Sequence, residues 1–445
     1  MFTNPFTFFP RVLPAWTNAY TDYIELFSFY NNLYIKSYYD ALKEFDSTNS
    51  SLYEAWLHHT DKELEQELRS EEFISLLSRF VTSFVELRSV FKDNNFPVEY
   101  FDKIFDNFVR NLMVFSSVPK EFDNTPFDVV STSGKTRLLH YRTDRIDDVK
   151  ENVNQKKTSP LLIVYAPINR YNIMDLTPEK SVIRELLSSG LDVYLIDWGY
   201  PSWDDDNLSL DNYFKYIYDA VQMIKDNSKV EKISILGYCW GGIIALIYAV
   251  LYKENVEKLA LMAVPIDASK DHSMLATWAK SIDTDKIIKE FRHMDGQILD
   301  LGFIMRNPPK YTFDKYLKFY QKLGDKKFVD TFIAVEKWLY DTPSIPGKLC
   351  SQIINDCYKN NLLIQNMMKL ENKEINLQSL DVPILLITAH NDDLVSPEST
   401  LAIREHIQGK NVESMQISGG HVGLCISAKA HKNLWPGVSQ WFLIK

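Results

Sequence analysis

The spacing of apolar side chains changes sharply along this chain. Between residues 73 and 91, large apolar residues recur every three or four positions, which predicts one long helix with an apolar face. Pro97 opens a second stripe of this kind, which predicts another helix through Leu112. Residues 1–122 are therefore expected to be helical, with the helices packed on each other, on another body or on a partner. The first stripe consists of Phe73, Leu76, Leu77, Phe80, Phe84, Leu87 and Phe91.

From Phe127 onward the pattern becomes one of short apolar runs bounded by turn residues, which is typical of strands. A helix-like run separates two of these runs, so we expect a doubly wound α/β sheet. After residue 265 the strand pattern stops for more than a hundred residues, and residues 266–378 are expected to form a mostly helical cap insertion. The core is then predicted at residues 123–265 and 379–445. The strand-like runs lie at 128–130, 137–141, 161–165, 192–196, 232–236, 259–264, 383–388 and 412–417.

One hexapeptide combines a reactive side chain with a sharp turn. Gly237-Tyr-Cys-Trp-Gly-Gly242 follows an apolar strand-like run and precedes a helix-like run at 243–252. This context is that of a nucleophile elbow, in which glycines allow a tight turn and close packing of strand and helix. Cys239 is thus predicted to be the nucleophile, and a thiol suits acyl groups that arrive as thioesters. The alternative is that Cys239 is a small buried apolar residue.

An acid and a histidine follow in the order that the α/β-hydrolase fold requires. Asp392 and Asp393 come just after the run at 383–388, and His421 lies in a glycine-rich loop after the run at 412–417. We select Asp392 as the acid because one residue and an apolar pair follow it, and expect Asp393 to stabilise a turn. His390 is the nearest rival to His421, but it lies on the wrong side of the acid. Cys239, Asp392 and His421 are therefore the predicted catalytic triad.

The composition and charge of the chain narrow the class of function further. The 445 residues are 45% hydrophobic, with a net charge of −10 that argues against nucleic acid as a general partner. The four cysteines, at 239, 350, 357 and 425, show neither a metal-ligand spacing nor a disulfide-rich pattern. The sequence has no apolar stretch of roughly twenty residues and no signal peptide at its start. We expect a cytoplasmic enzyme with no metal and no transmembrane segment.

Three stretches resemble the catalytic subunit of polyhydroxyalkanoate synthases. They are the hexapeptide at 237–242, Ile-Asp-Trp-Gly-Tyr-Pro at 196–201 and Ser-Gly-Gly-His-Val-Gly at 418–423. The loop Asn169-Arg-Tyr-Asn-Ile-Met-Asp-Leu176 is also similar to that family's loop. The chain departs from the family after the acid, where Asp393 replaces the usual histidine and Ser396 the usual proline.

The resemblance implies polymerisation of 3-hydroxyacyl coenzyme A, such as 3-hydroxybutyryl coenzyme A, into a polyester through an acyl-cysteine. It implies an oxyanion hole from the backbone N–H groups of Trp240 and Ile168, and a site shaped by Asp197 and Trp198. Coenzyme A is the product, and no separate cofactor is expected. The implied surroundings are the polyester granule and the growing chain, with the enzyme as a homodimer in the cytoplasm.

The N-terminal region suggests a second resemblance. Residues 56–60, 68–73 and 95–100 look like the helical accessory subunit of two-component short-chain synthases, so accessory and catalytic parts would be fused here. The alternative is an ordinary helical extension. Two other functions stay open: a cysteine-dependent thioesterase or dienelactone-hydrolase-like enzyme, and a non-catalytic protein that binds polyester granules.

Overall fold

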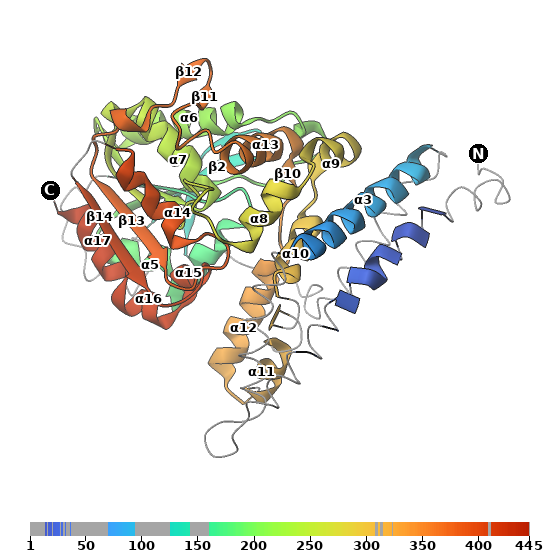
Figure 1. Ribbon diagram of the computed structural model, residues 1–445. Coiled ribbons are helices and arrows are strands. Elements are labelled where there is room, and N and C mark those ends of the chain that lie inside the picture. The colour runs from blue at the N-terminus through green and yellow to red at the C-terminus, as the bar shows by residue number, and fades with distance from the viewer. Residues whose placement is uncertain are drawn as a thin grey trace. The chain divides into compact units, whose positions relative to one another are not determined.

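The computed structural model describes residues 70–93, 125–142, 160–307, 310–311, 315–322, 324–407 and 411–444, with scattered positions between 14 and 36 (Figure 1). The chain divides into two compact units. The first draws on Met1–Val114, Ser281–Glu290 and Leu301–Lys318, and the second on Phe115–Lys280, Phe291–Asp300 and Phe319–Lys445. The predicted helix from Pro97 to Leu112 and the motifs at 56–60 and 95–100 lie outside the described residues. The predicted boundaries at 122, 265 and 378 stay predictions.

The second unit is built on an eight-stranded sheet in the order β1-β2-β6-β3-β7-β8-β13-β14. The pairs β1–β2 and β2–β6 are antiparallel, and every pair from β6 to β14 is parallel. The parallel strands follow the apolar runs of the sequence. The strands are β1 (Phe127–Ser133), β2 (Thr136–Tyr141), β3 (Pro160–Val164), β6 (Asp192–Asp197), β7 (Ile233–Tyr238), β8 (Val256–Met262), β13 (Ile384–Ala389) and β14 (Val412–Ile417).

Helices cover the central strands, which explains why β3 is apolar throughout and β7 is mostly apolar. All residues of β3 and β7 are buried, and so is every residue of α7 from Trp240 to Val250. Helices α6 and α7 pack on each other and on β3 and β7, and α17 packs on α5 and α16. The predicted doubly wound α/β architecture is confirmed. These helices are α5 (Val182–Ser188), α6 (Leu210–Ser228), α7 (Trp240–Leu251), α14 (Pro397–Leu401), α15 (Gly423–Ile426), α16 (Ala428–Asn433) and α17 (Trp435–Leu443).

The segment between β8 and β13 is mostly helical, as its pattern predicts. It also contains short antiparallel strand pairs, β9–β10 and β11–β12, which the sequence pattern did not indicate. The helices are α8 (Met274–Ser281), α9 (Thr284–Phe291), α10 (Gly296–Met305), α11 (Lys315–Gln321), α12 (Lys326–Leu339), α13 (Gly347–Gln352) and the π-helix η6 (Ile353–Lys359). The short strands are β9 (His293–Met294), β10 (Ile345–Pro346), β11 (Lys369–Leu370) and β12 (Lys373–Glu374), with β4 (Asp175–Thr177) and β5 (Lys180–Ser181) earlier in the chain.

The first unit contains the predicted long helix, α3 (Glu71–Asp93). Its described apolar stripe is buried, with Phe73 and Leu87 among the least exposed residues. Near its end, Arg88 Nη1 lies 3.3 Å from Glu290 Oε1 of α9, and both side chains are largely buried. The first unit thus joins N-terminal residues to residues of the later helical segment. Within the described residues, no helix is both long and apolar enough to cross a membrane.

Candidate active site

Cys239 sits on the turn that connects β7 to α7. Its φ of 52° and ψ of −128° are a conformation that residues with a Cβ rarely adopt. The Cys239 N–H donates to the carbonyl of Met262 in β8 at 3.0 Å, and its carbonyl accepts from Gly242 at 2.9 Å. The sheet and the helix therefore hold the strained turn from both sides, as in a nucleophile elbow.

The glycines of the hexapeptide are required by close backbone approach. A Cβ on Gly241 would lie 2.4 Å from the carbonyl oxygen of Tyr165, which directly follows β3. A Cβ on Gly237 would lie 2.5 Å from Cα of Gly242. Because such distances are not tolerated, α7 can start this close to β3 and β7 only with glycine at these positions.

Asp392 and His421 are brought together at the ends of β13 and β14. His421 Nδ1 lies 2.8 Å from Asp392 Oδ2. The other carboxylate oxygen, Oδ1, accepts the backbone N–H groups of Leu394 at 2.9 Å and Val395 at 3.0 Å. These bonds leave Oδ2 directed at the imidazole. Asp393, in contrast, is exposed. Asp392 is thus the carboxylate that contacts His421.

The electrostatic setting of His421 favours the imidazolium. Burial alone would lower the pKa of His421, but the nearby Asp392 carboxylate, with a smaller contribution from Cys239, raises it to about 10. The side chains are only 7% and 1% exposed for His421 and Asp392, respectively, so water screens this interaction little. The arrangement stabilises the protonated imidazole of His421.

Two buried tyrosines border the nucleophile turn. The ring of Tyr238 stacks on His421 with centroids 4.9 Å apart, and its hydroxyl donates to the His421 carbonyl at 3.2 Å. Tyr358, in η6, accepts from Trp240 Nε1 at 2.9 Å. Burial raises the pKa of both phenols well above the ordinary value, so both stay neutral. They orient the imidazole and the turn without adding charge.

The unusual Ser396 has a structural role in the acid loop. Its Oγ accepts the N–H of His272 at 2.8 Å, and its own N–H donates to Asp271 Oδ1 at 3.2 Å. A proline at this position could make neither bond. Ser396 thus fixes the loop after Asp392 to the loop after β8 through two hydrogen bonds.

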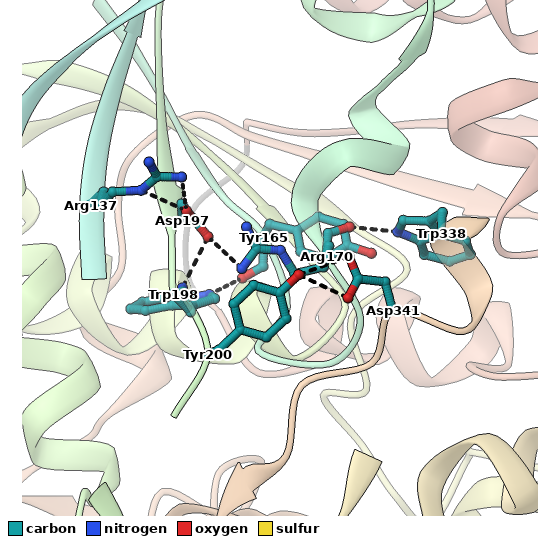
Figure 2. Close-up of polar contacts among 9 residues, drawn as sticks. Arg137, Tyr165, Arg170, Asp197, Trp198, Tyr200, Trp338 and Asp341 are labelled. Atoms are coloured by element: carbon teal, nitrogen blue, oxygen red, sulfur yellow. Dashed lines mark hydrogen bonds and ion pairs between the residues drawn. The ribbon is translucent and has the colours of Figure 1, made fainter. Parts of the chain in front are cut away.

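The remaining predicted residues follow β3, β6 and β7 in the chain or end one of these strands. Trp240 is the first residue of α7, so its N–H belongs to the donors that a helix start leaves without an intrahelical partner. Ile168 lies in the bend that follows β3. Asp197 pairs with Arg170, and Trp198 Nε1 donates to the carbonyl of Tyr165 at 2.7 Å (Figure 2). The catalytic and shaping roles of these residues stay predictions.

Sequence reasoning missed the residues that support the predicted ones. Tyr238 and Arg170 lie inside the quoted motifs, so their positions carried a signal that was not used. Tyr358 and Asp341 lie in the helical segment, where nothing local marks them. Their contacts join segments more than a hundred residues apart, and only the folded chain reveals such contacts.

Comparisons with known proteins show which family the chain belongs to. Residues 171–423 match the family described as alpha/beta hydrolase fold. The chain is 36% identical over 323 residues to "Poly(3-hydroxyalkanoate) polymerase subunit PhaC" of Haloferax mediterranei, a match that covers 72% of this chain and 64% of that protein. It thus spans somewhat less than two thirds of that relative.

Two bacterial relatives carry the same name. That of Thiocystis violacea is 35% identical over 318 residues, which are 71% of this chain and 88% of the relative. That of Synechocystis sp. is 35% identical over 292 residues, which are 63% of this chain and 77% of the relative. With the elbow and the aspartate–histidine pair in place, these matches show that the chain belongs to the PhaC family of poly(3-hydroxyalkanoate) polymerases, within the α/β-hydrolase superfamily.

Proposed function

We propose that this chain polymerises 3-hydroxyacyl coenzyme A into a polyester and releases coenzyme A. The observation that carries the proposal is the hydrogen bond between His421 and Asp392, together with Cys239 on the elbow between β7 and α7, in a chain that matches the PhaC family. The substrate class comes from that family, and the preferred acyl group is taken to be 3-hydroxybutyryl.

In the first half-reaction, His421 removes the proton of Cys239 and the thiolate attacks the thioester carbonyl. The carbon–sulfur bond to coenzyme A then breaks, and the imidazolium returns its proton to the leaving thiolate. Free coenzyme A and an acyl-cysteine result. The raised pKa of His421 supports this step, because it keeps the proton on the ring until the leaving group can accept it.

The negative charge that develops on the thioester oxygen needs donors. The N–H groups of Trp240 and Ile168 are proposed as the oxyanion hole, one at the start of α7 and one in the bend after β3. The positive end of the α7 dipole also favours the thiolate of Cys239. The oxyanion donors and the helix dipole both come from backbone segments, the start of α7 and the end of β3, which approach each other closely at Gly241.

In the second half-reaction, the 3-hydroxyl of another unit or of the growing chain attacks the acyl-cysteine. His421 takes the hydroxyl proton, an ester bond forms, and the Cys239 thiolate is released for the next cycle. Water competes with the hydroxyl at this step, so the site must exclude it. The low exposure of the His421 and Asp392 side chains is consistent with that requirement.

Since the product is a water-insoluble polyester, we propose that the enzyme acts at a granule surface in the cytoplasm, and that it works as a homodimer. Asp197 and Trp198 are proposed to shape the site rather than to transfer protons.

A direct test is incubation with 3-hydroxybutyryl coenzyme A while thiol release and turbidity are followed together. Thiol release with rising turbidity is expected. Thiol release with only soluble 3-hydroxybutyrate would indicate a thioesterase and contradict the proposal. Binding to polyester granules without thiol release would instead indicate the non-catalytic role.

A further inference from the structure

The bend after β3 is held by two indole groups from different parts of the second unit. Trp198 Nε1, after β6, donates to the carbonyl of Tyr165 at 2.7 Å. Trp338 Nε1, in α12, donates to the carbonyl of Arg170 at 2.6 Å. Both tryptophans are buried. The bend that contains Ile168 is therefore fixed at its first and last residues, once from the sheet and once from the later helical segment (Figure 2).

A second contact ties the same bend to the residues after α12. Asn169 has a φ of 57°, which is uncommon for a residue with a Cβ. Its Nδ2 donates to Thr342 Oγ1 at 2.6 Å and to the Leu339 carbonyl at 3.2 Å. The conformation of the residue next to Ile168 is thus held by the segment 338–342.

Four side chains connect this segment back to the sheet. Arg170, only 8% exposed, pairs with Asp197 at 3.2 Å and lies over the ring of Tyr200 at 4.3 Å. The Tyr200 hydroxyl donates to both oxygens of buried Asp341 at 2.8 Å. We call Asp197, Arg170, Tyr200 and Asp341 the clasp. Figure 2 shows its members in contact in this order.

The clasp contains one cation, two carboxylates and one neutral phenol. Asp197 Oδ2 also accepts from Arg137 Nε at 3.0 Å and Nη2 at 2.7 Å. The Arg170 guanidinium is therefore placed between an anchored carboxylate and the face of an aromatic ring, which attracts cations. The Tyr200 hydroxyl in turn holds the Asp341 carboxylate, since a hydrogen bond to a carboxylate is stronger than one between neutral groups.

We propose that Tyr200 and Asp341 are positioning residues, which fix the Ile168 N–H by locking the segment 338–342 onto the bend after β3 through Arg170. This rests on the proposed function only in assigning Ile168 to the oxyanion hole. The clasp lies beside the bend and donates no proton to the reaction. Its loss should therefore lower kcat through poorer oxyanion stabilisation and leave the nucleophile itself reactive.

The test compares Tyr200→Phe and Asp341→Ala with the wild-type enzyme. Each should lower kcat for coenzyme A release about tenfold with little change in KM, and the double variant should be no slower than Asp341→Ala alone. Asp341→Asn, which can still accept the phenol hydrogen bond, should retain most activity. Alkylation of Cys239 by iodoacetamide should proceed at the wild-type rate in all four.

Hydrogen exchange of the backbone supplies a readout that does not need the substrate. Amides of residues 166–169 should exchange about tenfold faster in Tyr200→Phe and Asp341→Ala. Tyr218→Phe, which removes a hydroxyl outside the clasp, is the matched control and should change nothing. Unchanged exchange in the clasp variants would overturn the inference, even if the enzyme polymerises. Faster exchange in the clasp variants of an enzyme that forms no polymer would instead support the positioning role of the clasp and contradict the proposed function.

Discussion

At the scale of single residues, the two neighbouring carboxylates after β13 are expected to differ greatly. Asp392→Asn should lower kcat by roughly 10³-fold or more, because the amide cannot hold His421 in the tautomer that accepts the thiol proton. Asp393→Asn is the matched control and should cost less than about threefold, since Asp393 is exposed. Steady-state kinetics of coenzyme A release measures both. If Asp393→Asn were the slower variant, Asp393 rather than Asp392 would be the catalytic acid.

The raised pKa of His421 predicts a pH-dependent contribution to stability. The pKa is about 10 in the folded chain against 6.5 ordinarily, so the folded state binds the proton more tightly. The contribution is complete below about pH 6.5 and is lost as the pH rises through 10. Urea unfolding of the wild type and His421→Gln should therefore show a larger difference in unfolding free energy at pH 6 than at pH 10.5. A difference independent of pH would show that the imidazolium does not stabilise the fold.

At the scale of elements, the contact between α7 and β3 is expected to be intolerant of a single methyl group. Gly241→Ala places a Cβ 2.4 Å from the Tyr165 carbonyl oxygen and must push the helix away. We expect a loss of about 1–3 kcal/mol in unfolding free energy. Gly302→Ala in α10 meets nothing within 4 Å and should stabilise by up to about 1 kcal/mol. Chemical denaturation measures both, and equal effects would contradict the packing argument.

The same element scale shows what the sequence could and could not predict. The central strands and most of α7 follow from local apolar patterns, because a parallel strand that is buried on both faces is mostly apolar. Asp392 was selected from its spacing to Leu394 and Val395, and both backbone N–H groups do bind its carboxylate. The Tyr200–Asp341 contact could not be predicted, since it joins positions 141 residues apart through an unremarkable aspartate.

At the scale of the whole molecule, the N-terminal region is proposed to act as a built-in accessory subunit. Within the first unit, Arg88 of α3 pairs with Glu290, whose side chain is 11% exposed. Deleting residues 1–122 would leave this carboxylate without its main partner, which is costly for a largely buried charge. We expect loss of activity, with partial recovery when the N-terminal fragment is added in trans. Full activity of the shortened chain would leave only an ordinary helical extension.

The central claim is that Cys239 carries the acyl group. Mass spectrometry tests it most directly, on enzyme that is quenched during turnover with 3-hydroxybutyryl coenzyme A. The wild type and Cys350→Ala, a control that removes a different cysteine, which is buried, should gain one or more 3-hydroxybutyryl units at Cys239. Cys239→Ala should gain none and release no coenzyme A. Coenzyme A release by Cys239→Ala within tenfold of the wild-type rate, or an acyl adduct on another residue, would contradict the account.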